Sequence, residues 1–310
     1  MKVHFGLPEA RLARVVLAIG SFDGVHLGHQ AVLRRVMEVA RAEGATAAWI
    51  TFDPHPRCVL DPANCPAQIT TLEERVSLVR RLGLEHGIVL PFDRALAALS
   101  AEDFMAGLLR VLDLRCLVAG HDFALGRGRE GDLDWLCRHG SRHGYRVEVV
   151  PPFRLDGEEV HSSEVRRLLI LGEVGGANRL LGRDYGLGGL VEPGDRIGRT
   201  IGWPTVNLAV PPGKLVPARG IYAGWATTPV GDRGAAISVG YRPQFARTDL
   251  RVEAYLLDFS GDLYQQRIEL RFVARLRDEA RFPSVEAMSA QIARDVEATR
   301  RILGLVPPSP

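Results

Sequence analysis

Two histidines lie three positions apart in a glycine-rich segment, residues 20–29, whose side chains could act on a phosphate. His26 and His29 follow a short apolar run at 15–19 and open an amphipathic segment at 29–43. Parallel sheets bind ligands at such strand-to-helix loops. Imidazole N–H groups there can stabilise charge on a phosphoryl group, and glycine lets a nucleotide approach closely. A helix-capping loop with two surface histidines is the alternative, which the position after the first strand disfavours.

Two further segments carry polar groups that could hold a ligand. Asp53 and His55 follow a second strand-like run and alternate with prolines that stiffen the loop. Ser162 and Ser163 are placed to cap a helix that carries Arg166, and hydroxyls with a guanidinium suit an ATP phosphate. A plain turn explains the first segment equally well. Without the histidine pair, a simple helix cap would be the better explanation of the second.

A GxGxxG pattern at Gly126, Gly128 and Gly131 resembles a dinucleotide fingerprint but lies in the wrong place. It follows the fourth strand-like run instead of the first. Arg127 and Arg129 occupy variable positions between its glycines. A single match of this kind is weak evidence for a dinucleotide cofactor. We interpret the segment as a mobile phosphate-binding loop.

The second half places oxygen donors beside a glycine-rich loop. Gly198 and Gly202 allow a loop to fold over phosphates with its N–H groups inward. Thr205 offers a hydroxyl and Asn207 an amide oxygen, which suit Mg²⁺ bound with nucleotide phosphates. Glu253 can take a proton from a substrate hydroxyl if it points into the mouth of a barrel. Considered alone, a turn-rich hairpin and a solvated glutamate explain these residues better.

The elements that must position these residues differ between the two halves of the chain. The first half alternates apolar runs with helical periods, which predicts a parallel α/β sheet covered on both faces. From Arg183 on, Gly and Pro separate short runs, which predicts a compact antiparallel barrel. The predicted strands are 15–19, 47–52, 87–90, 115–119, 147–150, 220–227, 235–239, 251–259 and 267–273. The predicted helices are 29–43, 71–82 with a capping box, 100–112, 132–143 and 284–303.

Composition limits the classes of function. The 310 residues suffice for two domains, and 39 basic against 37 acidic residues give a net charge of +2, too little to draw the chain to nucleic acid or membranes. No apolar stretch approaches about 18 residues, and no signal peptide is evident. Lys214 is followed by leucine, which excludes a Walker P-loop. The four cysteines indicate neither a disulfide framework nor a zinc site, so we expect a cytoplasmic setting.

Together these motifs resemble those of prokaryotic bifunctional riboflavin kinase/FAD synthetases. Residues 22–30, FDGVHLGHQ, are similar to the nucleotidylyl transferase signature in the N-terminal half of that family. Residues 194–207 resemble the GRTIGFPTAN segment of riboflavin kinases. Further segments that carry the resemblance are 51–56, 120–132, 160–166, 240–245 and 251–259. The resemblance covers nearly the whole chain.

The resemblance implies a Rossmann-like nucleotidylyl transferase domain at 1–182 and a small riboflavin kinase domain at 183–305. The second domain would be a six-stranded antiparallel barrel with a C-terminal helix. It would convert riboflavin and ATP to FMN, and the first domain would convert FMN and ATP to FAD and pyrophosphate. Mg²⁺ would be the cofactor and ATP the co-substrate, with neither nucleic acid nor membrane as a partner.

The resemblance also implies roles for individual residues. Glu253 would be the base of the kinase, while His26, His29 and Arg166 would serve adenylyl transfer. Thr205 and Asn207 would bind the metal. Nucleotide or phosphate contacts are expected from Gly20, Phe22, Asp23, Gly28, Ser162, Ser163, Gly198, Gly202, Thr205 and Asn207. Flavin contacts are expected from Asp53, His55, Asp122 and Phe123.

Two alternatives of another class stay open at this point. One is a monofunctional riboflavin kinase with a non-catalytic nucleotide-binding module at its N-terminus. Departures from the family pattern at Ser21, Ala124, Leu125 and His161 favour it. The other is a non-catalytic flavin carrier, against which Glu253 and the histidine motif argue, because a carrier needs no phosphoryl-transfer groups.

Overall fold

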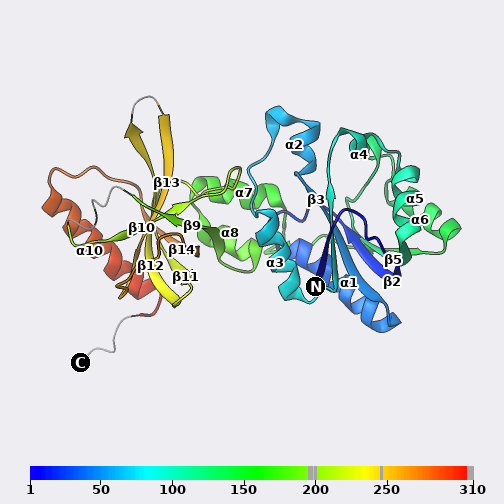
Figure 1. The fold of residues 1–310 in the computed structure, drawn as a ribbon, viewed down its shortest axis with the longest axis horizontal. Helices are drawn as coiled ribbons and strands as arrows, with labels where there is room; N and C mark the ends of the chain where they lie inside the picture. Colours follow the sequence, from blue (N-terminus) through cyan, green and yellow to red (C-terminus); the bar gives the residue numbers. More distant parts are fainter. Residues whose placement is uncertain (195–197, 199–200, 245–246, 306–310) are drawn as a thin grey trace. The chain divides into compact units, whose positions relative to one another are not determined.

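The computed structural model describes residues 1–194, 198, 201–244 and 247–305, without the side chains of 241–249. The chain divides into two compact units, Met1–Ser162 and Ser163–Pro310 (Figure 1). This division falls after the first residue of helix α7 (Ser162–Leu171) and before α8 (Val174–Leu181), whereas the sequence analysis placed all residues up to 182 in the first domain. The functional boundary at residue 182 stays a prediction.

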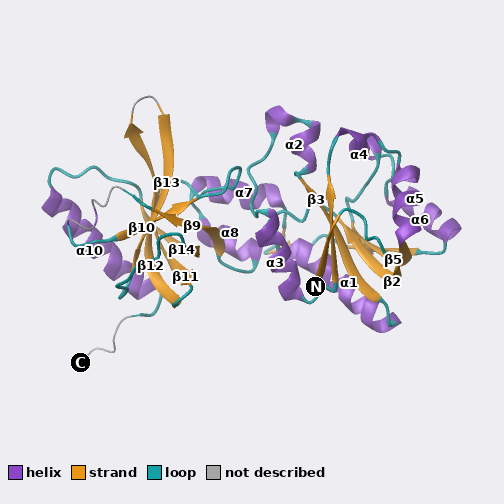
Figure 2. Ribbon diagram, viewed as in Figure 1, coloured by secondary structure: helices purple, strands orange, loops and turns teal. Residues whose placement is uncertain are grey.

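Six parallel strands form the sheet of the first unit, in the order β1-β4-β3-β2-β5-β6 (Figure 2). The chain runs from β2 to β3 and β4 on one side, then crosses to β5 and β6 on the other. The strand order therefore reverses beside β2. The strands are β1 (Lys2–Phe5), β2 (Leu12–Ile19), β3 (Thr46–Asp53), β4 (His86–Pro91), β5 (Leu112–Gly120) and β6 (Arg146–Val150). The five predicted strands are confirmed, and β1 is an addition at the edge.

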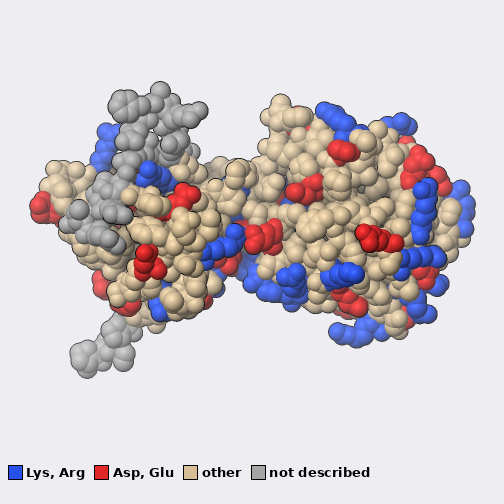
Figure 3. Space-filling model, in the orientation of Figure 1, with Lys and Arg blue, Asp and Glu red and all other residues tan. Residues whose placement is uncertain are grey.

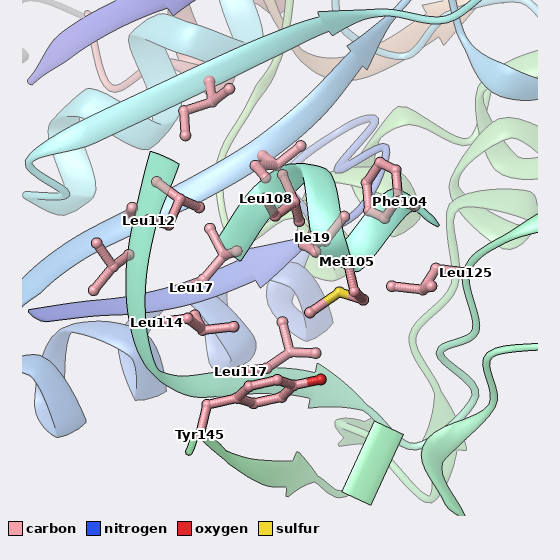
Figure 4. Packing of buried hydrophobic residues seen from close by; sticks show 14 of the residues in the cluster. Leu17, Ile19, Phe104, Met105, Leu108, Leu112, Leu114, Leu117, Leu125 and Tyr145 are labelled. Atoms are coloured by element: carbon pink, nitrogen blue, oxygen red, sulfur yellow. The ribbon is translucent and has the colours of Figure 1, made fainter. Parts of the chain in front are cut away.

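Helices cover both faces of this sheet because its buried strands are continuously apolar, so that consecutive side chains present apolar groups to both faces. Val16 and Ala18 pack with α1 and α3 on one face, and Leu17 packs with α5 and α6 on the other (Figure 4). Thr71 forms the predicted capping box with Glu74. The main helices are α1 (Leu27–Glu43), α3 (Leu72–Leu82), α5 (Ala101–Val111) and α6 (Leu133–His143). The short elements are α2 (Pro56–Leu60), η1 (Pro62–Asn64), α4 (Arg94–Ala98), η2 (Arg127–Arg129), β7 (Arg154–Leu155) and β8 (Glu158–Glu159).

A disulfide joins Cys58 on α2 to Cys65 after η1, with 4.3 Å between their Cα atoms. The expectation of no disulfide is therefore wrong. The pairing depends on the way α2 and η1 fold the chain back, which cysteine spacing does not reveal. Cys116 and Cys137 are free, and burial raises the pKa of the Cys116 thiol to about 11, so this thiol stays protonated at neutral pH.

The second unit contains a closed six-stranded barrel in the order β10-β13-β12-β11-β14-β9, and all six pairings are antiparallel. This confirms the expected barrel and its strand count. The strands are β9 (Tyr185–Glu192), β10 (Thr205–Ala209), β11 (Gly220–Thr228), β12 (Gly231–Gln244), β13 (Arg247–Leu256) and β14 (Arg267–Arg277). The side chain of Asn178 on α8 bonds Phe272 O and Tyr185 N, and so ties that helix to β14 and β9.

The terminal helix α10 (Val285–Ile302) lies against β11 and β12 and is held by an ion pair. Arg277 on β14 reaches Asp295 with Nε–Oδ1 at 3.0 Å and Nη2–Oδ2 at 2.7 Å. The Asp295 side chain is only 7 % exposed. A two-point pair in this environment fixes the helix position more firmly than exposed pairs do.

No helix within the described ranges is long and apolar enough to cross a membrane. Figure 3 shows basic and acidic side chains interspersed on the visible face, as the small net charge predicts.

We expect Asp295→Ala to loosen α10, because the change leaves the Arg277 guanidinium without its partner at a cost of about 2 kcal/mol. Hydrogen exchange of α10 amides, followed by mass spectrometry, measures this directly. Asp278→Ala is the matched control, since Asp278 pairs with Arg275 but is 83 % exposed. Equal protection of α10 in the two variants would contradict the assigned role of the pair.

Candidate active sites

A cavity of about 300 Å³ opens in the first unit where the strand order reverses. It lies at the carboxyl ends of β2, β5 and β6, which contribute Ile19, Gly20, Gly120 and Val150 to its wall. Such a reversal leaves a crevice between loops that turn in opposite directions, and open α/β sheets bind ligands there. The cavity unites three of the predicted segments, at residues 19–29, 120–123 and 159–162.

The predicted histidine pair lies in this cavity at the start of α1. His26 is the N-cap of the helix, and its Nδ1 accepts a hydrogen bond from His29 N at 3.3 Å. The two rings stack with centroids 3.7 Å apart, and the edge of Phe22 meets His29 at 5.2 Å. A side chain at Gly28 would press on His26 and on Val160 O. The two imidazoles therefore line the cavity beside the N-terminus of α1. A helix N-terminus attracts anions.

The loop before α1 holds a strained backbone. Phe22, Gly24 and Val25 all have positive φ, at 49°, 85° and 42°. For Phe22 and Val25 this conformation is unfavourable, yet both side chains are buried in the core. Strain of this kind persists only where packing enforces it, and it is common at ligand sites.

Asp23 is buried and holds this loop instead of lining the cavity. Its carboxylate accepts hydrogen bonds from Ile69 N at 3.1 Å, from Thr70 N at 2.9 Å and from Thr70 Oγ1 at 3.0 Å. The Ser162 hydroxyl donates to Asp23 O at 3.0 Å. Asp23 therefore connects the loop to the segment before α3, and its predicted phosphate contact stays a prediction.

Arg75 is a buried cation that the sequence analysis missed. It lies on α3 and donates to Thr51 Oγ1 at 3.0 Å and to Phe52 O at 3.3 Å. Burial lowers the pKa of its guanidinium, whereas the negative charges of Asp23 and Asp53 act in the opposite direction. Arg75 therefore places positive charge between the loop and the end of β3. Its only sequence signal was an arginine on a helix otherwise predicted to bury apolar residues.

The opposite wall of the cavity carries an acid between two histidines. Glu159 lies 3.4 Å from His121 Nε2 through one carboxylate oxygen and 3.4 Å from His161 Nε2 through the other. Asp122 and Phe123, predicted to contact flavin, also line the cavity. His121 and Glu159 were not predicted as site residues: His121 lies in the resembling segment 120–132 but was given no role there, and Glu159 lies just before the segment 160–166.

Other predicted residues lie elsewhere in the structure. Asp53 ends β3, and His55 caps α2 by accepting from Arg57 N, but neither lines the cavity. Ser163 and Arg166 lie on α7, beyond the division between the units, so their contact with nucleotide stays a prediction.

The GxGxxG segment packs against the start of α5. A Cβ atom at Gly126 would come within 2.6 Å of Ala101 N, so close packing explains this glycine. Arg129 donates to Asp122 O, which ties the segment to the cavity wall. Phosphate binding by this loop stays a prediction.

In the barrel, the predicted kinase residues meet on neighbouring strands. Asn207 on β10 lies directly opposite Glu253 on β13, and the Thr205 hydroxyl donates to Glu253 Oε2 at 3.1 Å. Arg251 Nη1 lies 3.9 Å from the other carboxylate oxygen of Glu253. A hydroxyl, an amide and a carboxylate thus share one face of the strand pair.

The sequence analysis considered a Glu253 side chain that points into the mouth of the barrel. In the structure it points outward. Its neighbours Val252 and Ala254 are 1 % and 0 % exposed, so alternation places Glu253, 34 % exposed in its side chain, on the opposite face. The interior is filled by apolar side chains. A substrate must therefore approach the β10–β13 pair from outside.

Aromatic rings border this outer face. Trp203 meets Tyr255 edge-on at 5.1 Å, and its Nε1 donates to Ser289 Oγ on α10 at 2.9 Å. None of these three residues was predicted. A hollow of about 600 Å³ lies beside Asn207 and is also lined by Arg251.

The glycine-rich loop before β10 is described only in part. Gly194 must remain small, because a Cβ there would come within 2.2 Å of Asn207 Nδ2. Gly202 has φ +85°, and Gly198 O accepts from Trp203 N. Residues 195–197 and 199–200 of the predicted loop lie outside the described residues.

Comparisons with known proteins match both units. A family model described as FAD synthetase matches residues 9–164, and one described as riboflavin kinase matches residues 181–303. The bifunctional riboflavin kinase/FMN adenylyltransferase of Escherichia coli K12 is 36% identical over 308 residues, which cover 98% of this chain and 97% of the relative. The enzyme of the same name from Listeria monocytogenes is 35% identical over 289 residues, covering 92% and 91%.

A solved structure shares the full architecture. A crystal structure described as a macrolide-efflux protein from Streptococcus pneumoniae superposes with a TM-score of 0.86 at 29% identity, covering 94% of this chain and 95% of that one. The sequence matches extend through both units. The chain therefore belongs to the bifunctional riboflavin kinase/FMN adenylyltransferase family.

Proposed function

We propose that the two units catalyse consecutive steps from riboflavin to FAD. The barrel would phosphorylate the riboflavin 5′-hydroxyl with ATP, giving FMN and ADP. The α/β unit would transfer the adenylyl group of a second ATP to FMN, giving FAD and pyrophosphate. The observation that carries this proposal is that each half matches its family model, while His26, His29, Asp122, Phe123 and Ser162 line one cavity and Thr205 and Glu253 are hydrogen-bonded in the barrel. A monofunctional kinase is not favoured, because the first half matches as well.

In the kinase site, Glu253 is the proposed base. Its carboxylate would take the proton of the riboflavin hydroxyl as the oxygen attacks the γ-phosphorus of ATP. The hydrogen bond from Thr205 fixes one carboxylate oxygen, and its partial exposure lets a substrate reach the other. Trp203 and Tyr255 offer ring edges and faces next to this point, where a flat aromatic substrate could pack.

The oxygen donors of this face fit magnesium. Thr205 Oγ1, the Asn207 amide oxygen and the Glu253 carboxylate are hard ligands on adjacent strand positions. Mg²⁺ bound there with the nucleotide would neutralise charge on the transferring phosphoryl group. Thr205 and Asn207 are its proposed ligands. Gly198 and Gly202 would let the preceding loop cover the phosphates.

In the adenylyl transfer site, the protein needs to supply orientation and positive potential. The FMN phosphate is already ionised, so its attack on the α-phosphorus of ATP needs no base. His26 and His29 would stabilise charge on the α-phosphate and the leaving pyrophosphate at the α1 N-terminus. We propose Gly20, Phe22, Gly28 and Ser162 as nucleotide contacts.

Further residues complete this proposal. Ser163 and Arg166 would bind phosphate, while Asp122 and Phe123 would bind the flavin. Asp53 and His55, at the end of β3 and the start of α2, would also contact the flavin, and Asp23 the nucleotide. The use of ATP in both steps fits a cytoplasmic location, which remains part of the proposal.

We expect His29→Ala to lower FAD formation from FMN by about 10²–10³-fold, the effect of removing one donor to a developing anion. FMN formation from riboflavin should stay within twofold, because that reaction occurs in the other unit. His4→Ala, on the edge strand β1, is the matched control and should keep both rates. Unchanged FAD synthesis in a folded His29→Ala protein would reject the site.

Glu253→Gln keeps the shape of the side chain but removes the base. We expect FMN formation from riboflavin to fall about 10²–10⁴-fold. Supplied with FMN and ATP, the same variant should make FAD at the parental rate. Glu269→Gln, on β14 of the same barrel, serves as the control for charge loss. Near-parental phosphorylation of riboflavin by folded Glu253→Gln would disprove the assignment.

Residues 1–182 expressed alone should form FAD from FMN and ATP, whereas residues 1–164 should be much slower, because they lack Arg166. Both fragments contain the whole sheet and the histidine loop. Separating FMN from FAD by chromatography gives both rates. A folded 1–182 fragment without activity would show that the functional boundary lies elsewhere, and equal rates would exclude Arg166 from the reaction.

A further inference from the structure

Two histidines and a glutamate converge on the outer side of the first unit, away from the residues that line its cavity. His139 and His143 lie one helical turn apart on α6, and Glu102 lies in the first turn of α5. Glu102 Oε1 is 3.5 Å from His139 Nε2 and 3.8 Å from His143 Nε2. One ligand atom from each residue lies within 4.8 Å of the others. Residues at i and i+4 share a helix face, which explains the convergence of the two imidazoles.

His139 is buried and aimed into this cluster. Its side chain is 1 % exposed, and its Nδ1 is engaged with Tyr145 OH at 2.8 Å. Its Nε2 faces Glu102 Oε1 at 3.5 Å, but among the residues that the structure describes it makes no well-aligned hydrogen bond. A buried polar atom that is poorly hydrogen-bonded is unfavourable, so such atoms are rare unless a ligand or ion satisfies them. Metal-binding histidines commonly engage their other ring nitrogen in this manner.

The rings are held in place by packing. Trp135 stacks on His139 with centroids 4.7 Å apart, and His139 stacks on His143 at 4.1 Å. Glu102 and His143 are 55% and 41% exposed in their side chains, which leaves a path from solvent. The site thus combines one fixed, buried nitrogen with two ligands that can adjust.

We propose that Glu102, His139 and His143 form a binding site for a divalent transition metal, with Zn²⁺ as the best-fitting ion. Ligand atoms about 2.0–2.1 Å from a tetrahedral zinc lie roughly 3.4 Å from one another. The observed separations of 3.5 and 3.8 Å from Glu102 need little adjustment, while the two stacked imidazoles, whose ligand atoms lie within 4.8 Å of each other, come together on one ion when the exposed His143 ring turns. Two imidazoles and one carboxylate leave a fourth position for water. Nitrogen ligands select against Mg²⁺, which prefers oxygen, so the site differs in kind from the proposed kinase metal site.

Zinc in this position would link helix α5, through Glu102, to helix α6, through His139 and His143. Ala101 N, at the start of α5, donates to Glu130 Oε1 at 2.8 Å, and Asp132 caps the start of α6. The two helices thus bracket the loop that follows the cavity residues Gly120–Phe123. The role of the ion is structural, since Glu102 and the two histidines do not line the cavity. This proposal does not rest on the proposed function.

The test is titration of the full chain, freed of metal by a chelator, with Zn²⁺ alone in a calorimeter against a competing chelator. We expect one equivalent to bind tightly in the parent, and at least 100-fold more weakly in His143→Gln and in Glu102→Gln. Both side chains are exposed enough that these variants should fold, unlike changes at buried His139. Excess Mg²⁺ should not displace the zinc.

Two controls make the result decisive. His4→Gln removes a histidine that contacts His86 at 3.0 Å outside the cluster, and it should keep the tight equivalent. Co²⁺ should give the visible absorption of a four-coordinate site in the parent and not in His143→Gln. Zinc should also raise the melting temperature of the parent but not of the two cluster variants. No tight equivalent in the parent, or equal binding by parent and His143→Gln, would overturn the proposal.

Discussion

The hydrogen bonds of the buried Asp23 carboxylate are the interaction on which the candidate site of the first unit depends. The carboxylate joins the loop after β2 to Ile69 and Thr70, and these precede the helix that carries Arg75. Burying a charge requires donors around it, and three hydrogen bonds supply them. With the loop fixed, Phe22 and Val25 keep unfavourable backbone angles. The histidines are then held at the helix N-terminus before any ligand binds, which is the preorganisation that electrostatic catalysis requires.

The barrel also holds its candidate site residues in place before a ligand binds, but by strand pairing. Closure of six strands fills the interior with apolar side chains, so polar groups must gather on the outside. Pairing of β10 with β13 sets Asn207 opposite Glu253, and the Thr205 hydroxyl orients the carboxylate. The terminal helix, held by Arg277 and Asp295, contributes Ser289 to the border of this face. The fold thus presents its candidate site on a rigid sheet.

The sequence by itself determined the elements and the segments that form the first site. Apolar runs and helical periods depend on neighbouring residues, so strands β2 to β6, helices α1, α3, α5, α6 and α10 and the Thr71 cap were predictable. The motif residues His26, Asp122 and Ser162 do meet in one cavity, because strand ends in a parallel sheet share an edge.

Only the tertiary structure decided which side chains that are distant in the sequence contact one another, and which face of a strand points outward. Asp23 bonds Thr70, 47 positions away, a contact that the motif around it does not reveal. The partners of Arg75, the pairing of Cys58 with Cys65 and the approach of Glu102 to His139 likewise leave no periodic trace in the sequence. Glu253 faces outward because its strand closes a barrel whose interior Val252 and Ala254 fill. These contacts join residues that come together only when the elements pack, so local pattern cannot specify them.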